Sequence, residues 1–299
     1  MNAIQEQDFY PSRYSTEDAI SERKDPVVYG KAEDGPLTQN ELDSYERDGF
    51  LFYPGFFGEE DLRAFKAELD RMCEEGRHSD ADEVIREPGS DIVRSIFAVH
   101  ESSKVFRTLA SSAAIAGRAQ QLLGDDVYVH QSRINYKPGF KGKEFYWHSD
   151  FETWHVEDGV PRMRMVSCAI WLTENNDVNG PVMFMPGSHK WFVHCSGGTP
   201  EDHYRQSLRK QEFGVPSNRS MAWLEERCGI VQPTGPAGSV VFFECNTMHG
   251  SNGNITPYPR SNAFFVFNSV RNAPRHAFGP KELRPHMLGS RDFTPVSQW

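Results

Sequence analysis

The sequence of 299 residues has few cysteines, no long apolar run and no excess of positive charge. Its five cysteines are odd in number and scattered, so a disulfide framework is not expected. The chain has no run of 18 apolar residues, which argues against a transmembrane helix. The first 35 residues are polar and acidic, unlike a signal peptide. We therefore expect a protein of the cytoplasm.

The net charge of −10 argues against binding to nucleic acid and against a polybasic membrane surface. Neither kind of partner is therefore expected. Hydrophobic residues make up 38% of the chain and aromatic residues 12%, which is enough for a real core. The length fits two small domains or one large β domain with helical additions, and we favour the single domain.

The first part of the chain is interpreted as an arm followed by helices. Residues 1–36 carry proline, glycine and charge without periodicity, and we expect them to form an N-terminal arm. Thr38 and Glu41 form a capping box that opens a helix, and Gly49 closes it. Apolar residues at helical spacing predict two further helices. The first ends at Gly76, and the second runs over about 103–123 and is closed by Gly124.

Beyond these helices the period of the apolar pattern changes to two, as in strands with one buried face. The predicted strands are 50–53, 128–137, 163–173, 181–185, 239–243 and 262–270. Residues 194–236 are expected to be an insertion with helical stretches near 202–211 and 219–227. Together these elements predict a mostly β fold with flanking helices. We expect a double-stranded β-helix, a barrel of the jelly-roll or cupin type, as one domain over 37–299.

The segment 145–167 carries the most specific chemical pattern. His148 and Asp150 stand two residues apart, behind an aromatic run and ahead of a predicted strand. Such a pair, completed by a distant histidine, is the ligand set of a non-haem Fe(II) oxygenase, which leaves three iron positions open. Two other His-x-acid pairs begin at His78 and His155. Their contexts indicate a solvated turn and a segment leading into a turn, so we favour His148.

Several histidines compete for the third ligand position: His189, His194, His203, His249 and His276. His249 is favoured because it follows the strand predicted at 239–243, and Arg260 stands eleven residues later at the entrance to the next strand. A 2-oxo acid chelates iron through one end, and a guanidinium can hold its far carboxylate bidentately. On the sequence alone, a surface salt bridge is nearly as good an interpretation of Arg260.

Two further features have competing interpretations. The strand at 128–137 alternates apolar residues with Gln131, Arg133, Asn135 and Lys137. This polar face is expected to meet solvent, although in a ligand-binding barrel it can point inward. Trp154 follows the metal pair, where a loop can cover the site, but an isolated tryptophan is more often part of a core.

Four segments match one family pattern: residues 131–145, 147–155, 246–251 and 254–260, with a shorter match at 23–26. They resemble the ectoine hydroxylases, a branch of the phytanoyl-CoA-dioxygenase-like Fe(II)/2-oxoglutarate enzymes. The resemblance runs over nearly the whole chain, and no matched ligand position departs from the pattern. The divergence lies in residues 75–85, in 194–236 and in the last ten residues.

The resemblance implies three groups of site residues. The iron ligands would be His148, Asp150 and His249. The 2-oxoglutarate contacts would be Lys137, Arg260, Asn135 and Ser251. The ectoine contacts would be Gln131, Trp154, Thr153 and, less securely placed, Arg284.

The implied activity is the hydroxylation of ectoine to 5-hydroxyectoine, a compatible solute. Its cofactor would be Fe(II), its cosubstrates 2-oxoglutarate and O2, and its by-products succinate and CO2. Two alternatives stay open: a related dioxygenase for another small amino-acid-like molecule, and a jelly-roll protein that binds metal without turnover. A homodimer is the assembly we consider for this chain.

Overall fold

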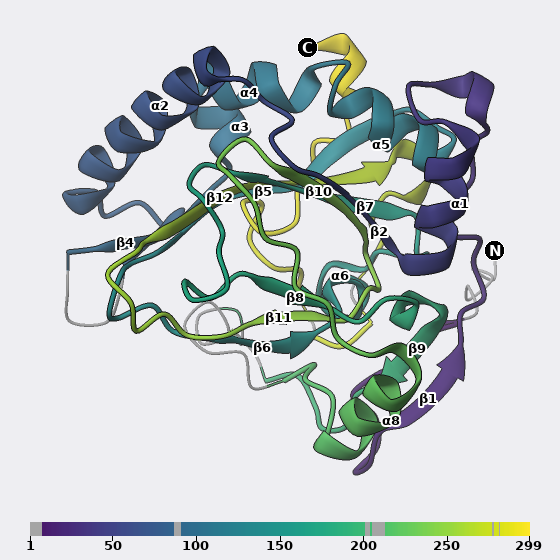
Figure 1. Cartoon of the computed structure of the whole chain (residues 1–299). Helices are drawn as coiled ribbons and strands as arrows, with labels where there is room; N and C mark the ends of the chain where they lie inside the picture. Colours follow the sequence, from purple (N-terminus) through teal and green to yellow (C-terminus); the bar gives the residue numbers. More distant parts are fainter. Residues whose placement is uncertain (1–7, 87–90, 201–203, 205–212, 277, 281) are drawn as a thin grey trace.

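The computed structural model describes residues 8–86, 91–200, 204, 213–276, 278–280 and 282–299. Its main element is an antiparallel seven-stranded sheet. The strand order is β2 (Phe50–Tyr53), β10 (Val240–Glu244), β7 (Met165–Trp171), β12 (Arg260–Ser269), β5 (Val127–Lys137), β4 (Val93–Phe97) and β3 (Val84–Arg86). A three-stranded sheet faces it (Figure 1), with the order β6 (Phe145–His148), β11 (His249–Ser251) and β8 (Val182–Phe184). Two facing sheets of this kind confirm the predicted jelly-roll barrel.

Helices cover the outer face of the large sheet (Figure 1): α1 (Gln39–Asp48), α2 (Glu59–Arg77), α3 (Val99–Ser102), α4 (Lys104–Ser111) and α5 (Ala116–Leu123). Their apolar sides and the outward side chains of the sheet form the main core cluster. Short 3-10 turns lie at Ala32–Asp34, Ser188–Lys190, Val270–Asn272 and Val296–Gln298. Among the described residues, no helix is both long and apolar enough to cross a membrane.

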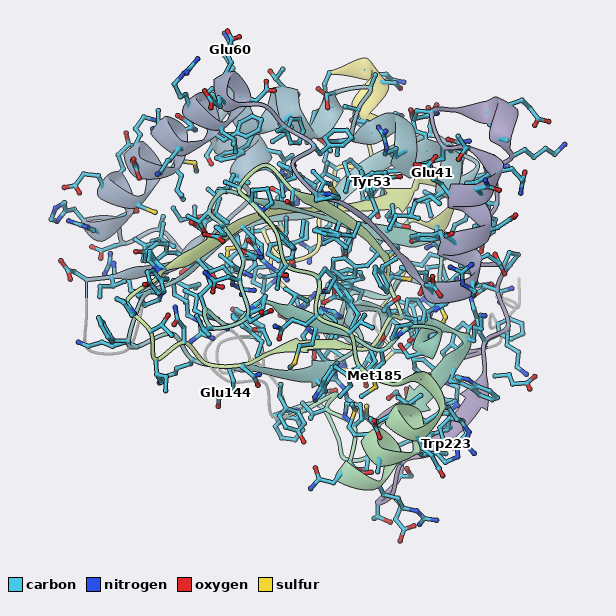
Figure 2. The ribbon with its side chains drawn as sticks, in the orientation of Figure 1. Glu41, Tyr53, Glu60, Glu144, Met185 and Trp223 are labelled. Carbon is cyan, nitrogen blue, oxygen red and sulfur yellow. The ribbon has the colours of Figure 1, made fainter. Side chains whose placement is uncertain are left out.

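Side-chain contacts tie the outer helices to the sheet. Thr38 and Glu41 form the predicted capping box at the start of α1. Glu41 also accepts a hydrogen bond of 2.6 Å from the Tyr53 hydroxyl on β2, and Figure 2 shows the two side chains together above the sheet. One carboxylate therefore both caps the helix and joins it to the edge strand.

On the far side of the barrel, α8 (Asn218–Cys228) packs near the two-stranded sheet of β1 (Ala19–Glu22) and β9 (Trp191–His194). Met185 and Trp223, both labelled in Figure 2, belong to the small apolar cluster at this place. Trp223 meets Trp191 edge-on at 5.1 Å between ring centroids. The helix predicted over 219–227 is confirmed as α8, whereas the stretch predicted near 202–211 lies outside the described residues except Tyr204.

Residues 8–36, within the segment predicted as an arm, lie along the barrel. β1 pairs antiparallel with β9. Arg13 is buried in an ion pair with Glu152, and Arg23 in one with Glu244. The division into an arm, one domain and an insertion over 194–236 stays a prediction.

The polar face of β5 points into the barrel, so the expectation that it meets solvent is wrong. Gln131 and Lys137 are each only 4% exposed. Lys137 pairs in register with Arg260 on β12, and its Nζ donates to Ser251 Oγ on β11 of the facing sheet. A period of two reveals only that the two faces of a strand differ. It does not reveal whether the polar face meets water or the polar interior of a barrel.

The single helix predicted over 103–123 is also wrong, because the structure has α4 and α5 instead. Ser112 leaves the helical region at φ −62° and ψ 144°, and its hydroxyl donates to Leu109 O at 2.7 Å. A serine hydroxyl that bonds to a nearby backbone carbonyl competes with continuation of the helix. The predicted closure at Gly124 is confirmed.

Gly49 and Gly55 both have a positive φ, but only Gly49 lacks space for a Cβ atom, so the two positions distinguish steric contact from backbone strain. Gly49 has φ 80°, and a Cβ there would lie 2.4 Å from His189 Nδ1 and 2.7 Å from Thr247 Oγ1. Gly55 has φ 60°, but its nearest such contact is 3.8 Å away. We expect Gly55→Ala to cost about 1 kcal/mol of unfolding free energy through strain alone. Gly49→Ala should cost about 1–3 kcal/mol more through overpacking. Urea denaturation measures both, and equal losses would contradict the close approach.

Candidate metal centre

Two paired strands and one helix start bring the three predicted metal ligands together. His148 is the last residue of β6 and His249 the first of β11, and the two are partners in the antiparallel register. Asp150 follows as the first residue of α6 (Asp150–Asp158). One strand pairing thus closes the loop of 100 residues between the two histidines.

The donor atoms of the three side chains surround a common point. His148 Nε2 lies 3.6 Å from Asp150 Oδ1, and His249 Nε2 lies 3.8 Å from Asp150 Oδ2. One ligand atom from each residue can be chosen so that all three lie within 4.8 Å of one another. Among the described residues, this is the only such group of histidine, cysteine and acidic side chains.

Backbone contacts determine which nitrogen of each histidine faces this point. His148 Nδ1 lies 2.7 Å from Tyr146 O, and His249 Nδ1 lies 3.0 Å from Thr247 O. A carbonyl can only accept a hydrogen bond, so each Nδ1 carries the proton and each Nε2 presents its lone pair. Two imidazole nitrogens and one carboxylate fit a divalent metal with open coordination positions.

The charge states of the ligands suit a metal as well. Burial alone would raise the pKa of the Asp150 carboxyl, but His249, His148 and Arg133 hold it well below its usual range. Burial and the neighbouring His148 lower the pKa of His249 to about 4. At neutral pH the site therefore offers an ionised carboxylate and an uncharged His249 imidazole.

Two buried basic side chains lie on the inner face of the large sheet. Lys137 Nζ donates to Ser251 Oγ at 2.9 Å and to Asn252 O at 2.5 Å. Arg260 is 3% exposed, and its NH1 has no hydrogen-bond partner among the described residues. Burial lowers the pKa of Arg260 to about 10, and burial together with Arg260 lowers the pKa of Lys137 to about 6. A buried guanidinium with an unused donor fits a carboxylate ligand.

Asn262 is a candidate site residue that the sequence analysis missed. It stands two residues after Arg260 on the same face of β12 and pairs in register with Asn135 and Trp171. Both polar atoms of its side chain are buried without a described partner, as are Ser167 Oγ and Trp171 Nε1. Such unpaired groups mark positions where ligand atoms or water are expected. The period of two from Arg260 would have indicated Asn262.

The other residues implied for 2-oxoglutarate are on the same side of the barrel. Asn135 Oδ1 accepts a hydrogen bond of 2.8 Å from Ser95 Oγ. Ser251 is buried and accepts from Lys137. The structure therefore brings together all four residues of this group.

The residues implied for ectoine are less uniformly placed. Gln131 is on the inner face, where its Nε2 donates to Leu288 O at 2.7 Å and its Oε1 accepts from Arg133. Trp154 is 2% exposed and belongs to an apolar cluster with Phe151. Thr153 is half-buried on the same helix.

Arg284 is buried in an ion pair that uses two of its nitrogens, with Nε 2.7 Å from Asp158 Oδ1 and NH2 2.5 Å from Oδ2. Asp158 also lies 3.0 Å from His130 Nε2. This ion pair joins the C-terminal segment to the end of α6. Trp154 and Arg284 thus have structural contacts of their own.

The competing histidines lie apart from the triad. His155 is buried, with Nδ1 2.7 Å from Val160 O and Nε2 3.0 Å from Asp8 Oδ1, so both its nitrogens have partners. His78 is exposed at the end of α2. The remaining candidates are His189 near Glu46 O, His194 at the end of β9, the exposed His276, and His203, which lies outside the described residues.

His148→Ala should abolish metal binding, whereas His155→Ala should retain it and lose folding stability instead. The first variant removes a donor of the triad, and the second removes buried hydrogen bonds and a ring stacked at 4.1 Å on Phe278. Anaerobic Fe(II) titration and thermal denaturation of both variants check this contrast. If His155→Ala lost the metal as completely as His148→Ala, the wrong pair would have been chosen.

Comparison with known proteins agrees with this geometry. The model of the phytanoyl-CoA dioxygenase (PhyH) family matches residues 45–262. The ectoine dioxygenase of Stutzerimonas stutzeri is 52% identical over 291 residues, which cover 97% of this chain and 96% of the relative. That of Halomonas elongata is 51% identical over 94% of this chain and 86% of its own.

Solved structures agree too. EctD from S. alaskensis with 2-oxoglutarate and 5-hydroxyectoine matches with a TM-score of 0.88 and 44% identity, over 97% of both chains. The same protein with bound Fe matches with a TM-score of 0.86 and 45% identity, over 95% of both chains. Because the family model spans most of the chain and these relatives match nearly all of it, the protein belongs to the phytanoyl-CoA dioxygenase family, among the ectoine dioxygenases.

Proposed function

We propose that this protein is an Fe(II)- and 2-oxoglutarate-dependent dioxygenase that hydroxylates ectoine to 5-hydroxyectoine. The observation that carries the proposal is that the triad and a buried guanidinium with an unused donor lie within one barrel. A metal site of two histidines and a carboxylate needs a cosubstrate at its open positions. Arg260 supplies a positive charge that would hold the far end of an anionic cosubstrate, and the bound anion would favour protonation of Lys137 beside it.

His148, Asp150 and His249 would hold the Fe(II). When bound, the iron supplies the activation of O2 and the oxidative decarboxylation of 2-oxoglutarate to succinate and CO2, with transfer of a hydroxyl group to the substrate. The protein contributes fixed imidazole tautomers, an ionised carboxylate and a binding place from which bulk water is excluded. The tautomers follow from the hydrogen bonds of the two histidines, and the ionised carboxylate follows from the neighbours of the buried Asp150.

The spacing along β11 supports 2-oxoglutarate as the cosubstrate. His249 begins this strand, and Ser251, two residues on, accepts the hydrogen bond from Lys137. Two residues of a strand rise roughly 7 Å, a span that suits a five-carbon diacid chelated at one end and ion-paired at the other. Arg260 and Lys137 would bind the far carboxylate, while Ser251 and Asn135 would complete its hydrogen bonds.

Ectoine would lie between this place and the end of the barrel at α6. It is a cyclic amidinium with a carboxylate, so it needs both an aromatic face and polar partners. Gln131 and Asn262 offer amides on the inner face, and Trp154 and Thr153 come from α6 directly after the metal ligand Asp150. For Trp154 the proposal requires that one ring face meets the substrate although the ring packs in a core cluster. Arg284 would add a donor beyond the two nitrogens that bind Asp158.

We further propose that the protein acts in the cytoplasm. Its five cysteines are all free, and Cys168, Cys195 and Cys245 are buried, as is usual in a reducing compartment. A homodimer stays a prediction, which sedimentation of the purified protein would test.

A single assay distinguishes the proposed function from its alternatives. The protein is incubated with Fe(II), 2-oxoglutarate, O2 and ectoine, and succinate and hydroxylated product are both quantified. We expect the two products in a ratio near one. Succinate formed only with another small amino-acid-like molecule would favour the related dioxygenase. Metal binding without succinate from any tested substrate would favour a non-catalytic protein.

Arg260→Ala should weaken the binding of 2-oxoglutarate much more than the binding of ectoine. A hydrogen bond to a charged group contributes about 1.5–3 kcal/mol, so the apparent affinity for 2-oxoglutarate should fall at least about tenfold. Arg260→Lys is the matched control, because it keeps the positive charge but loses the planar guanidinium. Its apparent affinity for 2-oxoglutarate should lie between those of the parent and of Arg260→Ala. Activity measured over a concentration series of 2-oxoglutarate, and over one of ectoine, gives the two apparent affinities. Unchanged dependence on 2-oxoglutarate would exclude this role for Arg260.

A further inference from the structure

Ser149 stands between the metal ligands His148 and Asp150, and its side chain does not form the hydrogen bond expected at its position. It occupies the N-cap of α6, where a serine hydroxyl normally accepts a hydrogen bond from the first helical turn. Here no such capping bond is made. The hydroxyl instead donates to Asn246 Oδ1 at 2.8 Å, and both residues are buried.

The Asn246 side chain is held in one orientation. Its Nδ2 donates to His189 O at 3.1 Å and to Trp191 O at 3.0 Å. These carbonyls only accept, so the amide nitrogen must face them and Oδ1 must face Ser149. All the polar atoms of this amide are therefore engaged, and Ser149 meets a fixed acceptor.

The backbone around Asn246 is anchored as firmly. Its N–H donates to Glu244 Oε2 at 2.7 Å, and Glu244 forms a buried ion pair of 2.7 Å with Arg23 NH1. Thr247 N donates to Glu244 O at 2.9 Å, and Thr247 O is the carbonyl that orients the His249 ring. Residues 244–249 thus lead from one buried ion pair to the third metal ligand.

Strand pairing places His148 against His249 but does not include Asp150. β6 and β11 pair at His148–His249 and at Phe145–Ser251, with a register irregularity between these two points. Asp150 lies beyond the end of β6 and outside this pairing. The Ser149–Asn246 hydrogen bond joins the two segments there, next to a backbone hydrogen bond of 2.9 Å from Phe151 N to Cys245 O.

We propose that Ser149 and Asn246 are a positioning pair, which sets the distance between the His148–Asp150 half and the His249 half of the triad. This inference rests on the proposed function, in which the triad holds Fe(II). Neither side chain would touch the metal. The pair would act by keeping the three donors at the spacing that one ion requires, as hydrogen bonds behind metal ligands commonly do.

The test uses the full-length protein and Fe(II) under anaerobic conditions. Ser149→Ala should lower the Fe(II) affinity by about 10–100-fold, the range found when the groups that support metal ligands are removed. Ser149→Thr, which keeps a hydroxyl, should recover most of that affinity. At saturating Fe(II), Ser149→Ala should also form more succinate per hydroxylated product than the parent. Misplaced ligands weaken the coupling between decarboxylation of 2-oxoglutarate and hydroxylation of the substrate.

Ser217→Ala is the matched control. Ser217 is the N-cap of α8, and its hydroxyl accepts the local bond from Ser220 N at 3.3 Å. Losing it should lower the thermal midpoint without changing the Fe(II) affinity. This control shows whether a stability loss by itself weakens the metal.

A double-mutant cycle with Asn246→Ala completes the experiment. If the two residues act as one pair, the affinity loss in the double variant should be smaller than the sum of the single losses. Thermal denaturation checks that each variant folds. A parent that binds Fe(II) while Ser149→Ala binds it equally well would overturn the positioning pair alone. A parent that binds no Fe(II) would overturn the proposed function.

Discussion

The pairing of β6 with β11 is the contact on which the whole site depends. It places His148 opposite His249 although the two are far apart in the sequence, and two backbone carbonyls orient the imidazoles toward Asp150. The other strands of the barrel surround this pair. The large sheet, backed by its layer of helices, contributes the polar face of β5 to the barrel interior, and β8 flanks β11 on the other edge.

Buried charge is the second constraint, because it is expensive unless compensated. Around α6 the protein compensates its own charges, with Arg13 bound to Glu152 and Glu157, and Arg284 bound to Asp158. These ion pairs surround the helix that begins with the metal ligand. At the opposite part of the inner face, among the described residues, no carboxylate forms an ion pair with Arg260. Arg13 and Arg284 are thus ion-paired within the fold, whereas Arg260 is available to bind an anionic ligand.

The sequence predicted what depends on short-range pattern. The His148–Asp150 pair, the capping box at Thr38 and the six predicted strands are local, and the structure has them near the expected positions. The short strands β6 and β11, which carry the two histidines, were not predicted. The direction of the polar face of β5 could not be predicted, because alternation is the same whether that face meets water or a barrel interior. The break at Ser112 was missed because apolar spacing continues across it.

Long-range contacts were beyond the sequence for another reason. The Ser149–Asn246 bond joins residues 97 positions apart, and nothing in either neighbourhood indicates the other. Asn262 lay within a predicted strand and drew no notice, since a polar residue in a strand is ordinary. Only the three-dimensional structure shows that its amide is buried without a partner.

The neighbouring Lys137 and Arg260 have a consequence for the resting protein. Burial and the neighbouring guanidinium lower the pKa of Lys137 to about 6, so at neutral pH its amine is mostly uncharged, and keeping it in this state is a standing cost of the fold. A doubly charged diacid that binds there relieves it, so folding and cosubstrate level become thermodynamically linked. The protein would then be most stable against unfolding when 2-oxoglutarate is abundant and least stable when it is scarce.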